Sequence, residues 1–259
     1  MQQEARMVAR HRAQLEELLT NYGEIHMLSL DQWLGPRVWP EVRKTILKLR
    51  ELQPNVMLRA RGIGNYGDYY TPEGFVPVDK SNSTIPWMVI YPLASGFSFD
   101  PDASHYKGAS WIVHNIVDTA AKGGNFQVGI GPDAAGQYHP VAIEQLKQVG
   151  RWLRVCGEGI YATRPREAAH WREGETIRFT RAKDNRTVYC FALEWPGKSL
   201  VVQSARPASN SRITMFGYRE PMKWIVDSAL GLKIEIPETL QAEGRRPNQY
   251  AWGWAIRTG

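Results

Sequence analysis

The sequence predicts two regions of different class: a partial (β/α) barrel over residues 1–165, followed by an antiparallel β-sandwich over residues 166–259. Up to about Cys156, short apolar runs alternate with amphipathic stretches of helical length, which is the pattern of parallel α/β architectures. After about Ala169 the apolar runs become short and alternating and are separated by turn residues, as in sandwiches. About four βα units fit into the first region. A complete (β/α)₈ barrel repeats the unit eight times, so this region corresponds to half a barrel.

An amphipathic helix over 3–20 opens the first region, and Asn21 and Gly23 end it. Strands are then expected at 25–30, 56–60, 87–91 and 126–130, and helices at 40–52, 109–122 and 140–156. The run 25–30 is almost entirely apolar without helical periodicity, so we expect a strand buried on both faces of a parallel sheet. A loop at 61–86, rich in Gly, Tyr and Asn, follows the second strand, and loops of this length are usually functional or disordered.

The second region is predicted to begin near Arg164-Pro165-Arg166. Its strands are expected at 176–180, 188–193, 200–204, 212–216, 233–236 and 250–256. Three tryptophans, Trp224, Trp252 and Trp254, are interpreted as core residues rather than as a platform for sugar rings.

Composition indicates a soluble globular protein, with 43% apolar and 22% charged residues. The net charge is +6, but basic and acidic residues are interleaved, so neither a nucleic-acid nor a membrane partner is expected. The first twenty residues form a charged amphipathic helix rather than a signal peptide, and the location, secreted or cytoplasmic, stays unknown. Cys156 and Cys190 are predicted to be buried thiols. The histidines lack metal-binding spacing, and we expect no metal or cofactor.

The segment 62–67 matches the dinucleotide pattern G-x-G-x-x-G directly after a predicted strand. That mechanism requires the glycines to open a helix whose amino terminus faces the pyrophosphate. Asp68-Tyr69-Tyr70-Thr71-Pro72 follows instead, so no helix can begin there and nucleotide binding is not expected. A Gly-x-Ser-x-Gly elbow, the commonest sign of a serine hydrolase, is also absent from the sequence.

Carboxylates follow several predicted strands, at Asp31, Asp68, Glu73, Asp100, Asp102 and Asp133. Retaining glycoside hydrolysis needs an ionised nucleophile and a protonated acid about 5 Å apart. Asp31 after the first strand and Glu73 after the second would converge in this way at the mouth of a sheet. The nearby aromatic side chains that could receive a sugar ring are Trp33, Tyr66, Tyr69 and Tyr70. From its position alone, Asp31 could equally cap a loop or the start of a helix.

Residues 18–31, LLTNYGEIHMLSLD, resemble the segment of glycoside hydrolase family 29, the retaining α-L-fucosidases, that ends in the catalytic nucleophile. Residues 71–73 (TPE), 122–133 (KGGNFQVGIGPD) and 149–162 (VGRWLRVCGEGIYA) resemble further segments of this family in the same order. The resemblance covers almost the whole chain.

The resemblance implies that Asp31 is the nucleophile that forms a fucosyl-enzyme intermediate and that Glu73 is the acid/base. It also implies that Arg61 contacts the sugar near the nucleophile and keeps Asp31 ionised. The other residues assigned to substrate binding are Trp33, Tyr66, Tyr69 and Trp87. The implied substrate is a fucosylated glycan or a small α-L-fucoside, and the family needs no metal.

The chain departs from the family at three places. Met88 follows Trp87 where many members have Glu, so the acid/base role falls to Glu73. Ser29-Leu30 replace the usual aromatic residue beside the nucleophile. The family's first barrel strands, whose histidines hold the fucose hydroxyls, have no counterpart here.

A partial barrel leaves open strand edges and an uncovered apolar face. We therefore expect either a homo-oligomer or association with a missing N-terminal half. The alternative interpretation is a catalytically inactive carbohydrate-binding or structural protein that keeps only the fold.

Overall fold

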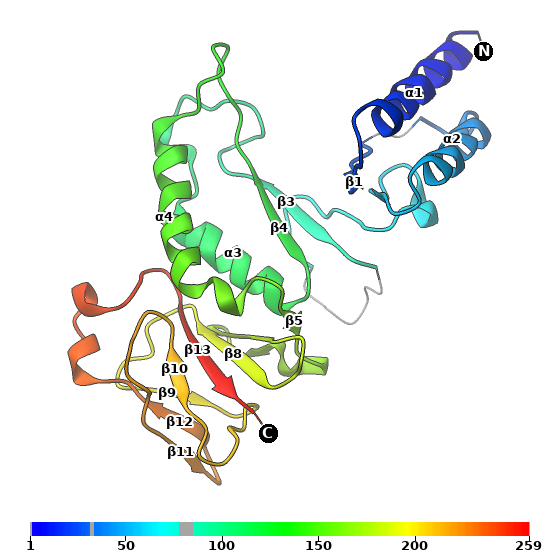
Figure 1. The fold of residues 1–259 in the computed structure, drawn as a ribbon. Helices are drawn as coiled ribbons and strands as arrows, with labels where there is room; N and C mark the ends of the chain where they lie inside the picture. Colours follow the sequence, from blue (N-terminus) through cyan, green and yellow to red (C-terminus); the bar gives the residue numbers. More distant parts are fainter. Residues whose placement is uncertain (1, 32–33, 78–84, 259) are drawn as a thin grey trace. The chain divides into compact units, whose positions relative to one another are not determined.

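The computed structural model describes residues 2–31, 34–77 and 85–258, without the side chains of residues 168 and 169. The chain divides into two compact units (Figure 1). The first unit is Met1–Pro72 with Ser83–Met88, and the second is Glu73–Asn82 with Val89–Gly259.

The first unit packs two helices on one side of two short strands. Helices α1 (Gln2–Asn21) and α2 (Trp39–Leu52) contact each other through buried aliphatic residues such as Leu15, Ile46 and Leu49. Strands β1 (Met27–Leu28) and β2 (Met57–Leu58) are parallel, with Leu28 opposite Leu58. The Gln53 amide fixes the connections between these elements, because it donates to the carbonyls of Leu19 and Gly23 and accepts from the Ile25 N–H.

Both strands are shorter than predicted, and the expectation that the first is buried on both faces is wrong. Met27 and Met57 lie opposite each other and are 45% and 43% exposed, whereas Leu58 is fully buried. Over the described residues this sheet has only two strands, and their second face has no cover within the unit. A strand depends on its neighbours for burial, so an apolar run alone does not establish it.

The α/β part of the second unit consists of strands β3 (Met88–Pro92) and β4 (Asn125–Gly129) and helices α3 (Ala109–Ala121) and α4 (Pro140–Cys156). Met88, the first residue of β3, belongs to the first unit. The predictions of both helices are confirmed to within one residue. Pro140 and the His139 ring, which accepts from the Val141 N–H, define the start of α4.

Two antiparallel sheets form the rest of the second unit. One contains, in spatial order, β10 (Ile213–Met215), β13 (Trp252–Arg257), β8 (Thr187–Ala192), β7 (Ile177–Arg181) and β5 (Arg164–Pro165), with β6 (Arg172–Glu173) also on β7. The other contains β11 (Trp224–Asp227), β12 (Gly231–Glu235) and β9 (Ser199–Val202). Short 3₁₀ helices are η1 (Gly64–Tyr66), η3 (Ala103–His105), η4 (Gly157–Gly159), η5 (Ala168–Trp171), η6 (Glu238–Leu240) and η7 (Glu243–Arg245).

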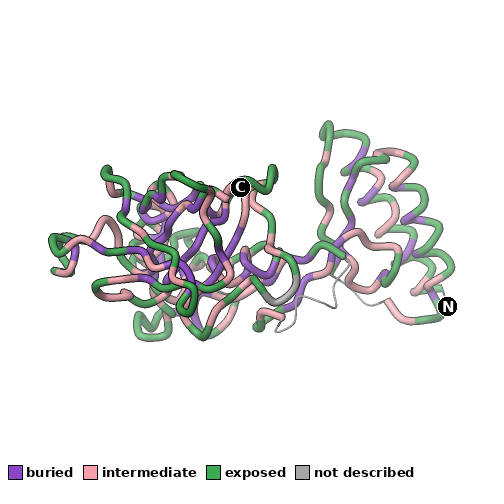
Figure 2. Tube along the Cα trace, turned by 90° about the horizontal axis from the view of Figure 1, so that it is seen from below, coloured by how far each residue is buried: buried purple, intermediate pink, exposed green. Residues whose placement is uncertain are grey.

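Buried residues of both sheets form one hydrophobic cluster. Buried residues are purple along the trace in Figure 2. Trp254 is fully buried there, Trp252 is buried and Trp224 packs against this core, as predicted. A second cluster, with Val117, Trp152 and Phe191 among its members, joins α3 and α4 to strands β8 and β13. The α/β part and the sandwich of this unit therefore share a continuous packed boundary.

Close approach at that boundary requires glycine. A Cβ at Gly253 would lie 2.5 Å from Phe216 and 2.8 Å from Phe191.

Both cysteines are free and buried, as predicted, and burial raises the pKa of Cys156 to about 12. Among the described helices, none combines the length and apolarity needed to cross a bilayer.

Candidate functional site

Asp31 lies just beyond strand β1, and two arginines from the segment that follows β2 approach its carboxylate. Arg61 Nη1 donates to Asp31 Oδ1 at 3.0 Å, and Arg59 Nη1 lies 3.7 Å from Oδ2. The Asp31 side chain is nevertheless 64% exposed. The arginines thus hold the carboxylate in place while much of it faces solvent, which suits a nucleophile that must reach a substrate.

Arg59 is the buried member of this group, with a side chain only 6% exposed. Its Nε donates to Thr71 Oγ1 at 2.6 Å, and its Nη1 donates to Ser29 Oγ at 3.2 Å. Arg61 Nη2 donates to the Thr71 carbonyl at 3.2 Å, so one threonine orients both arginines.

The sequence reading identified Arg61 but missed Arg59, Ser29 and Thr71. A signal for Arg59 was available, because residues two apart in an extended segment point to the same side. Thr71 had no such signal, since its role follows from how the loop folds back onto the strand.

Tyr69 lies in the same cluster and is 4% exposed. Burial raises the pKa of its hydroxyl, an effect opposed by the nearby Ser29 side chain and by the charge of Arg59. Its backbone also pairs with Arg59, since Tyr69 and Arg59 form an isolated parallel bridge. The structure therefore brings Asp31, Arg61 and Tyr69 together from among the predicted site residues.

Tyr66 makes its contacts with helix α2. Its hydroxyl accepts from Arg43 Nε, its ring meets that of Trp39 edge-on at 5.6 Å, and its carbonyl accepts from Arg50. Trp39 and Tyr66 line a hollow of about 390 Å³ in this unit. Residues Gly64–Tyr66 form a single 3₁₀ turn and Gly67 is extended, so no α-helix begins at these glycines, as predicted.

Trp87 is 5% exposed, and its backbone forms a parallel bridge with Tyr70. Trp33 lies outside the described residues.

Asp68, Asp100, Asp102 and Asp133 have hydrogen-bond partners away from Asp31. Asp68 accepts from the Leu58 N–H and from Arg50, and Asp102 caps the 3₁₀ turn at Ser104. Asp133 accepts from the backbone of its own turn, at Ala135 and Gln137. Asp100 accepts from Ser95, from the Asp102 N–H and from the His105 ring.

The Asp100 interactions predict a pH dependence of stability. Hydrogen bonds from Ser95 and from the Asp102 backbone, together with His105, lower the pKa of Asp100 to about 2 from an ordinary value of 3.8. A carboxyl whose pKa is lower in the folded state contributes stability above its unfolded pKa and loses it as the pH falls towards the folded pKa. We expect the free energy of unfolding in urea to fall between pH 4 and pH 2 by less in Asp100→Asn than in the wild type. Equal pH slopes for the two proteins would contradict this assignment.

Glu73 belongs to the second unit and is exposed. It forms an isolated parallel bridge with Ile90 of β3, and the Gly74 N–H donates to the Ile90 carbonyl at 3.0 Å. Gly74 has φ +76°, a value that glycine adopts readily, so the chain turns directly after Glu73. The backbone on either side of this carboxylate is therefore fixed.

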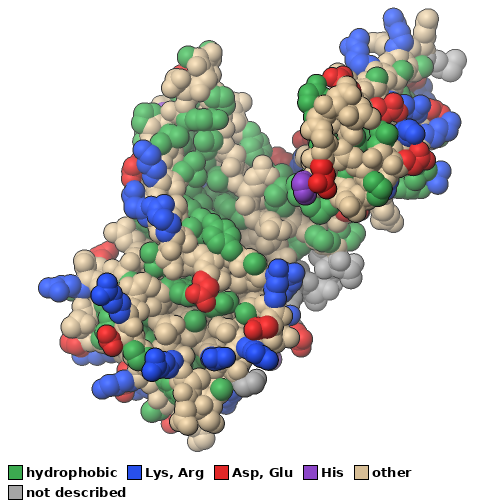
Figure 3. All heavy atoms as spheres, viewed as in Figure 1, with side chains coloured by type: hydrophobic (Ala, Val, Ile, Leu, Met, Phe, Trp, Pro, Cys, Tyr) green, Lys and Arg blue, Asp and Glu red, His purple; other side chains and the backbone are tan. Residues whose placement is uncertain are grey.

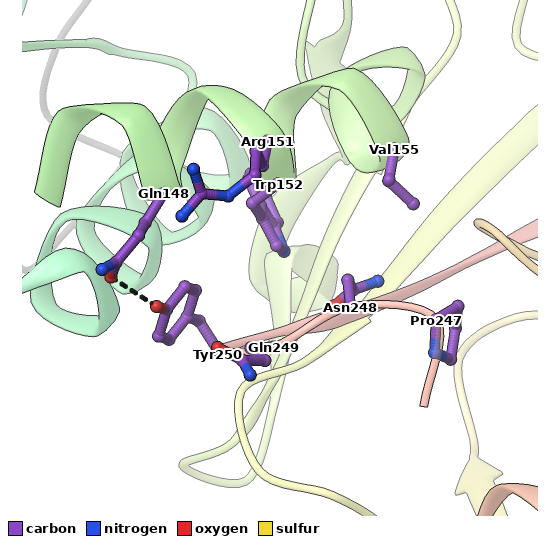
Figure 4. Close-up of a pocket in the computed structure, with 8 residues that line it drawn as sticks. All are labelled: Gln148, Arg151, Trp152, Val155, Pro247, Asn248, Gln249 and Tyr250. Carbon is purple, nitrogen blue, oxygen red and sulfur yellow. Dashed lines mark hydrogen bonds between the residues drawn. The ribbon is translucent and has the colours of Figure 1, made fainter. Parts of the chain in front are cut away.

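A hollow of about 350 Å³ lies in the second unit between α4 and residues 247–250 (Figure 4). Tyr250 spans it and donates from its hydroxyl to Gln148 Oε1 at 2.7 Å. Its walls contain no Asp or Glu, so this hollow lacks the pair of carboxylates that glycoside hydrolysis requires. No group of three or more potential metal ligands occurs within the described ranges.

Comparison with known proteins identifies the family. The profile described as "Alpha-L-fucosidase" matches residues 2–158, and the profile described as "Alpha-L-fucosidase C-terminal domain" matches residues 173–257. The chain belongs to the alpha-L-fucosidase family. Asp31, Arg59, Arg61 and Glu73 all lie within the alpha-L-fucosidase match.

Curated alpha-L-fucosidases are between 25% and 33% identical to the chain over the aligned residues. The alpha-L-fucosidase of Branchiostoma floridae is 30% identical over 196 residues, which are 74% of this chain and 42% of the relative. Human tissue alpha-L-fucosidase is 32% identical over 193 residues, which are 73% of this chain and 40% of the relative. The chain therefore spans less than half of the length of these relatives.

Solved alpha-L-fucosidase structures share the fold. Isoenzyme 1 from Paenibacillus thiaminolyticus superimposes with a TM-score of 0.82 at 22% identity, covering 98% of this chain and 63% of that structure. The Thermotoga maritima alpha-fucosidase in complex with fucose gives a TM-score of 0.79 at 20% identity, covering 96% and 56%.

Proposed function

We propose that this chain carries the nucleophile and the acid/base of a retaining α-L-fucosidase, which hydrolyses terminal α-L-fucosides of glycans or small molecules. The observation that carries the proposal is the Asp31 carboxylate, exposed at the end of a parallel strand and held by Arg61 at 3.0 Å. A nucleophile must be accessible and held in place, and the exposure of this carboxylate beside two guanidinium groups supports the role.

The proposed mechanism has two displacements. In the first, Asp31 attacks the anomeric carbon while Glu73 protonates the departing oxygen, and a fucosyl-enzyme forms. In the second, Glu73 takes a proton from a water molecule whose oxygen attacks the anomeric carbon, the bond to Asp31 breaks, and fucose is released with its anomeric configuration retained. Arg61 is proposed to contact the sugar beside the nucleophile, and Trp33, Tyr66, Tyr69 and Trp87 are proposed to contribute substrate-binding surface.

We also propose that the α/β part, residues 1–165, corresponds to about four βα units of a TIM-like barrel and that residues 166–259 form the sandwich domain. The two family profiles, which end at residue 158 and begin at residue 173, support a division in this region.

A partner is proposed to cover the exposed apolar face, either a second copy of this chain or the N-terminal half of the family's barrel. The exposed pair Met27 and Met57 supports this in the first unit. In the second unit, hydrophobic side chains gather on the face between α4 and β4 (Figure 3). We propose no nucleic-acid, membrane or cofactor partner.

The test is hydrolysis of an aryl α-L-fucoside by the purified chain, followed by ¹H NMR to identify the anomer released first. We expect α-L-fucose to appear before mutarotation, because two inversions give net retention. The mass in solution is measured on the same sample. β-L-Fucose as first product would contradict the mechanism, and a folded chain without turnover would favour the non-catalytic alternative. A mass equal to the 29.5 kDa of one chain would contradict self-association.

A further inference from the structure

A hollow of about 270 Å³ in the second unit is lined mostly by basic and aromatic side chains. Asp118 comes from α3 and Lys122 directly follows that helix. Trp171 and Arg172 come from the segment η5–β6, and Arg178 comes from β7. None of these residues belongs to the site proposed for hydrolysis.

Two buried cations in this hollow share one carboxylate. Lys122 Nζ lies 2.6 Å from Asp118 Oδ2, and Arg178 Nε lies 2.6 Å from Asp118 Oδ1. The Lys122 and Arg178 side chains are only 9% and 10% exposed. Buried charges require pairing, and a single carboxylate leaves one of these two positive charges uncompensated.

Arg172 adds a third positive charge to the rim. Its described acidic neighbour is Glu175, at 3.5 Å with a side chain that is 87% exposed, and such an ion pair in water contributes little. The carboxyl end of α3 supplies a partial negative charge of about one half, which is smaller than the surplus. The lining therefore has three cations against one carboxylate.

These cations also have unused hydrogen-bond donors. Arg178 uses Nε for Asp118 and Nη1 for the carbonyls of Glu175 and Ile177, while its Nη2 has no acceptor among the described residues. The Arg172 guanidinium donates no hydrogen bond to any residue that the structure describes. Guanidinium groups with free N–H donors bind oxyanions well because their planar geometry matches two oxygens.

The three cations of the hollow all lie close to the Trp171 ring. Lys122 Nζ lies 4.9 Å, Arg172 Cζ 5.1 Å and Arg178 Cζ 5.3 Å from its ring centroid. A ring has two faces, so at least two of these like charges lie on the same side. Cation–π attraction lowers the energy of each cation but does not cancel its charge.

A purely structural network would explain part of this arrangement, because the Arg178–Asp118 pair ties β7 to α3. It does not explain why Arg172 also lies beside the Trp171 ring, or why two arginines that line the hollow keep donors without a described acceptor. We propose that this hollow binds a tetrahedral oxyanion, either a free sulfate or phosphate ion or the same group as an ester on a glycan. The site is independent of the proposed hydrolysis.

The test follows the Trp171 indole in ¹⁵N-tryptophan-labelled full chain, with its signal assigned by Trp171→Phe. Sodium sulfate, sodium phosphate and N-acetylglucosamine 6-sulfate are titrated against sodium chloride at matched ionic strength. We expect saturable movement of the Trp171 signal with the oxyanions and no saturation with chloride. A sulfate ester that binds about tenfold more tightly than free sulfate would identify the glycan-borne group, and equal affinities would identify the free ion.

Arg172→Gln tests the site without disturbing a buried group, because Arg172 is exposed. Loss of one charge-assisted contact is expected to weaken oxyanion binding by about tenfold or more. Lys183→Gln, which removes an exposed charge from the turn between β7 and β8, is the matched control and should bind as the wild type does. An Arg172→Gln affinity equal to the wild type, or no saturable shift at all, would overturn the proposal and leave a structural network.

Discussion

The Asp31→Gly variant is expected to lose about three orders of magnitude or more in kcat for an aryl α-L-fucoside. Removing the nucleophile eliminates the covalent route, and the remaining groups offer only binding and electrostatic stabilisation. The fold should persist, because the Asp31 side chain is 64% exposed and makes its described contacts only with Arg59 and Arg61. Initial rates and far-UV circular dichroism measure the two expectations.

Azide provides a sharper test of the same variant. With the carboxylate gone, an azide ion can enter beside the two arginines and displace the aryl group in a single step. We expect partial recovery of the rate and β-L-fucosyl azide as product, because one displacement inverts the anomeric carbon. Asp133→Ala is the matched control, since Asp133 accepts only from its own turn. An Asp31→Gly variant as active as the wild type would show that Asp31 merely caps the loop.

The second large effect is expected in Glu73→Ala and depends on the leaving group. General acid catalysis contributes about 10²- to 10⁴-fold when the departing oxygen must be protonated. We therefore expect kcat/KM to fall within that range for fucosides of alkyl alcohols. The loss should be much smaller for a dinitrophenyl fucoside, whose leaving group departs without a proton.

Comparing the two substrates separates catalysis from positioning. A residue that only orients the sugar would reduce both rates by the same factor, and that result would contradict the acid/base role of Glu73. Glu220→Gln removes another exposed carboxylate and serves as the control that should leave both rates unchanged.

The helices were predictable because their signals are local. Pro140 and Gly157 lie at the ends of α4, and the apolar residues between them follow the helical period, so the prediction of 140–156 is confirmed. The strands near the site were less predictable. Strands β1 and β2 are defined by their pairing with each other, and this pairing extends over only two residues in each strand. Strand β11 was missed because Ile225 and Val226 are both exposed and lack the alternation of a half-buried strand.

In the candidate site, too, features with a local signal were predictable and features that depend on tertiary contacts were not. Asp31 was recognisable as a carboxylate directly after an apolar run, and Arg61 through the family resemblance. Thr71 and Ser29 could be assigned only from the structure, because their side-chain oxygens accept hydrogen bonds from Arg59 across the fold. The sequence thus identified the candidate carboxylate and Arg61 beside it, but not the residues that orient the arginines.

The separate hydrophobic clusters of the two units have a consequence for the way heat acts on the protein. The hydrophobic cluster of the first unit consists of buried residues between Val8 and Ile63. Both clusters of the second unit consist of buried residues between Leu93 and Ile256. Cooperative melting requires a shared core, and the smaller cluster is the less stable one. Denaturation should therefore proceed in two steps, with Asp31 losing its arginines while the sandwich around Trp254 is still intact.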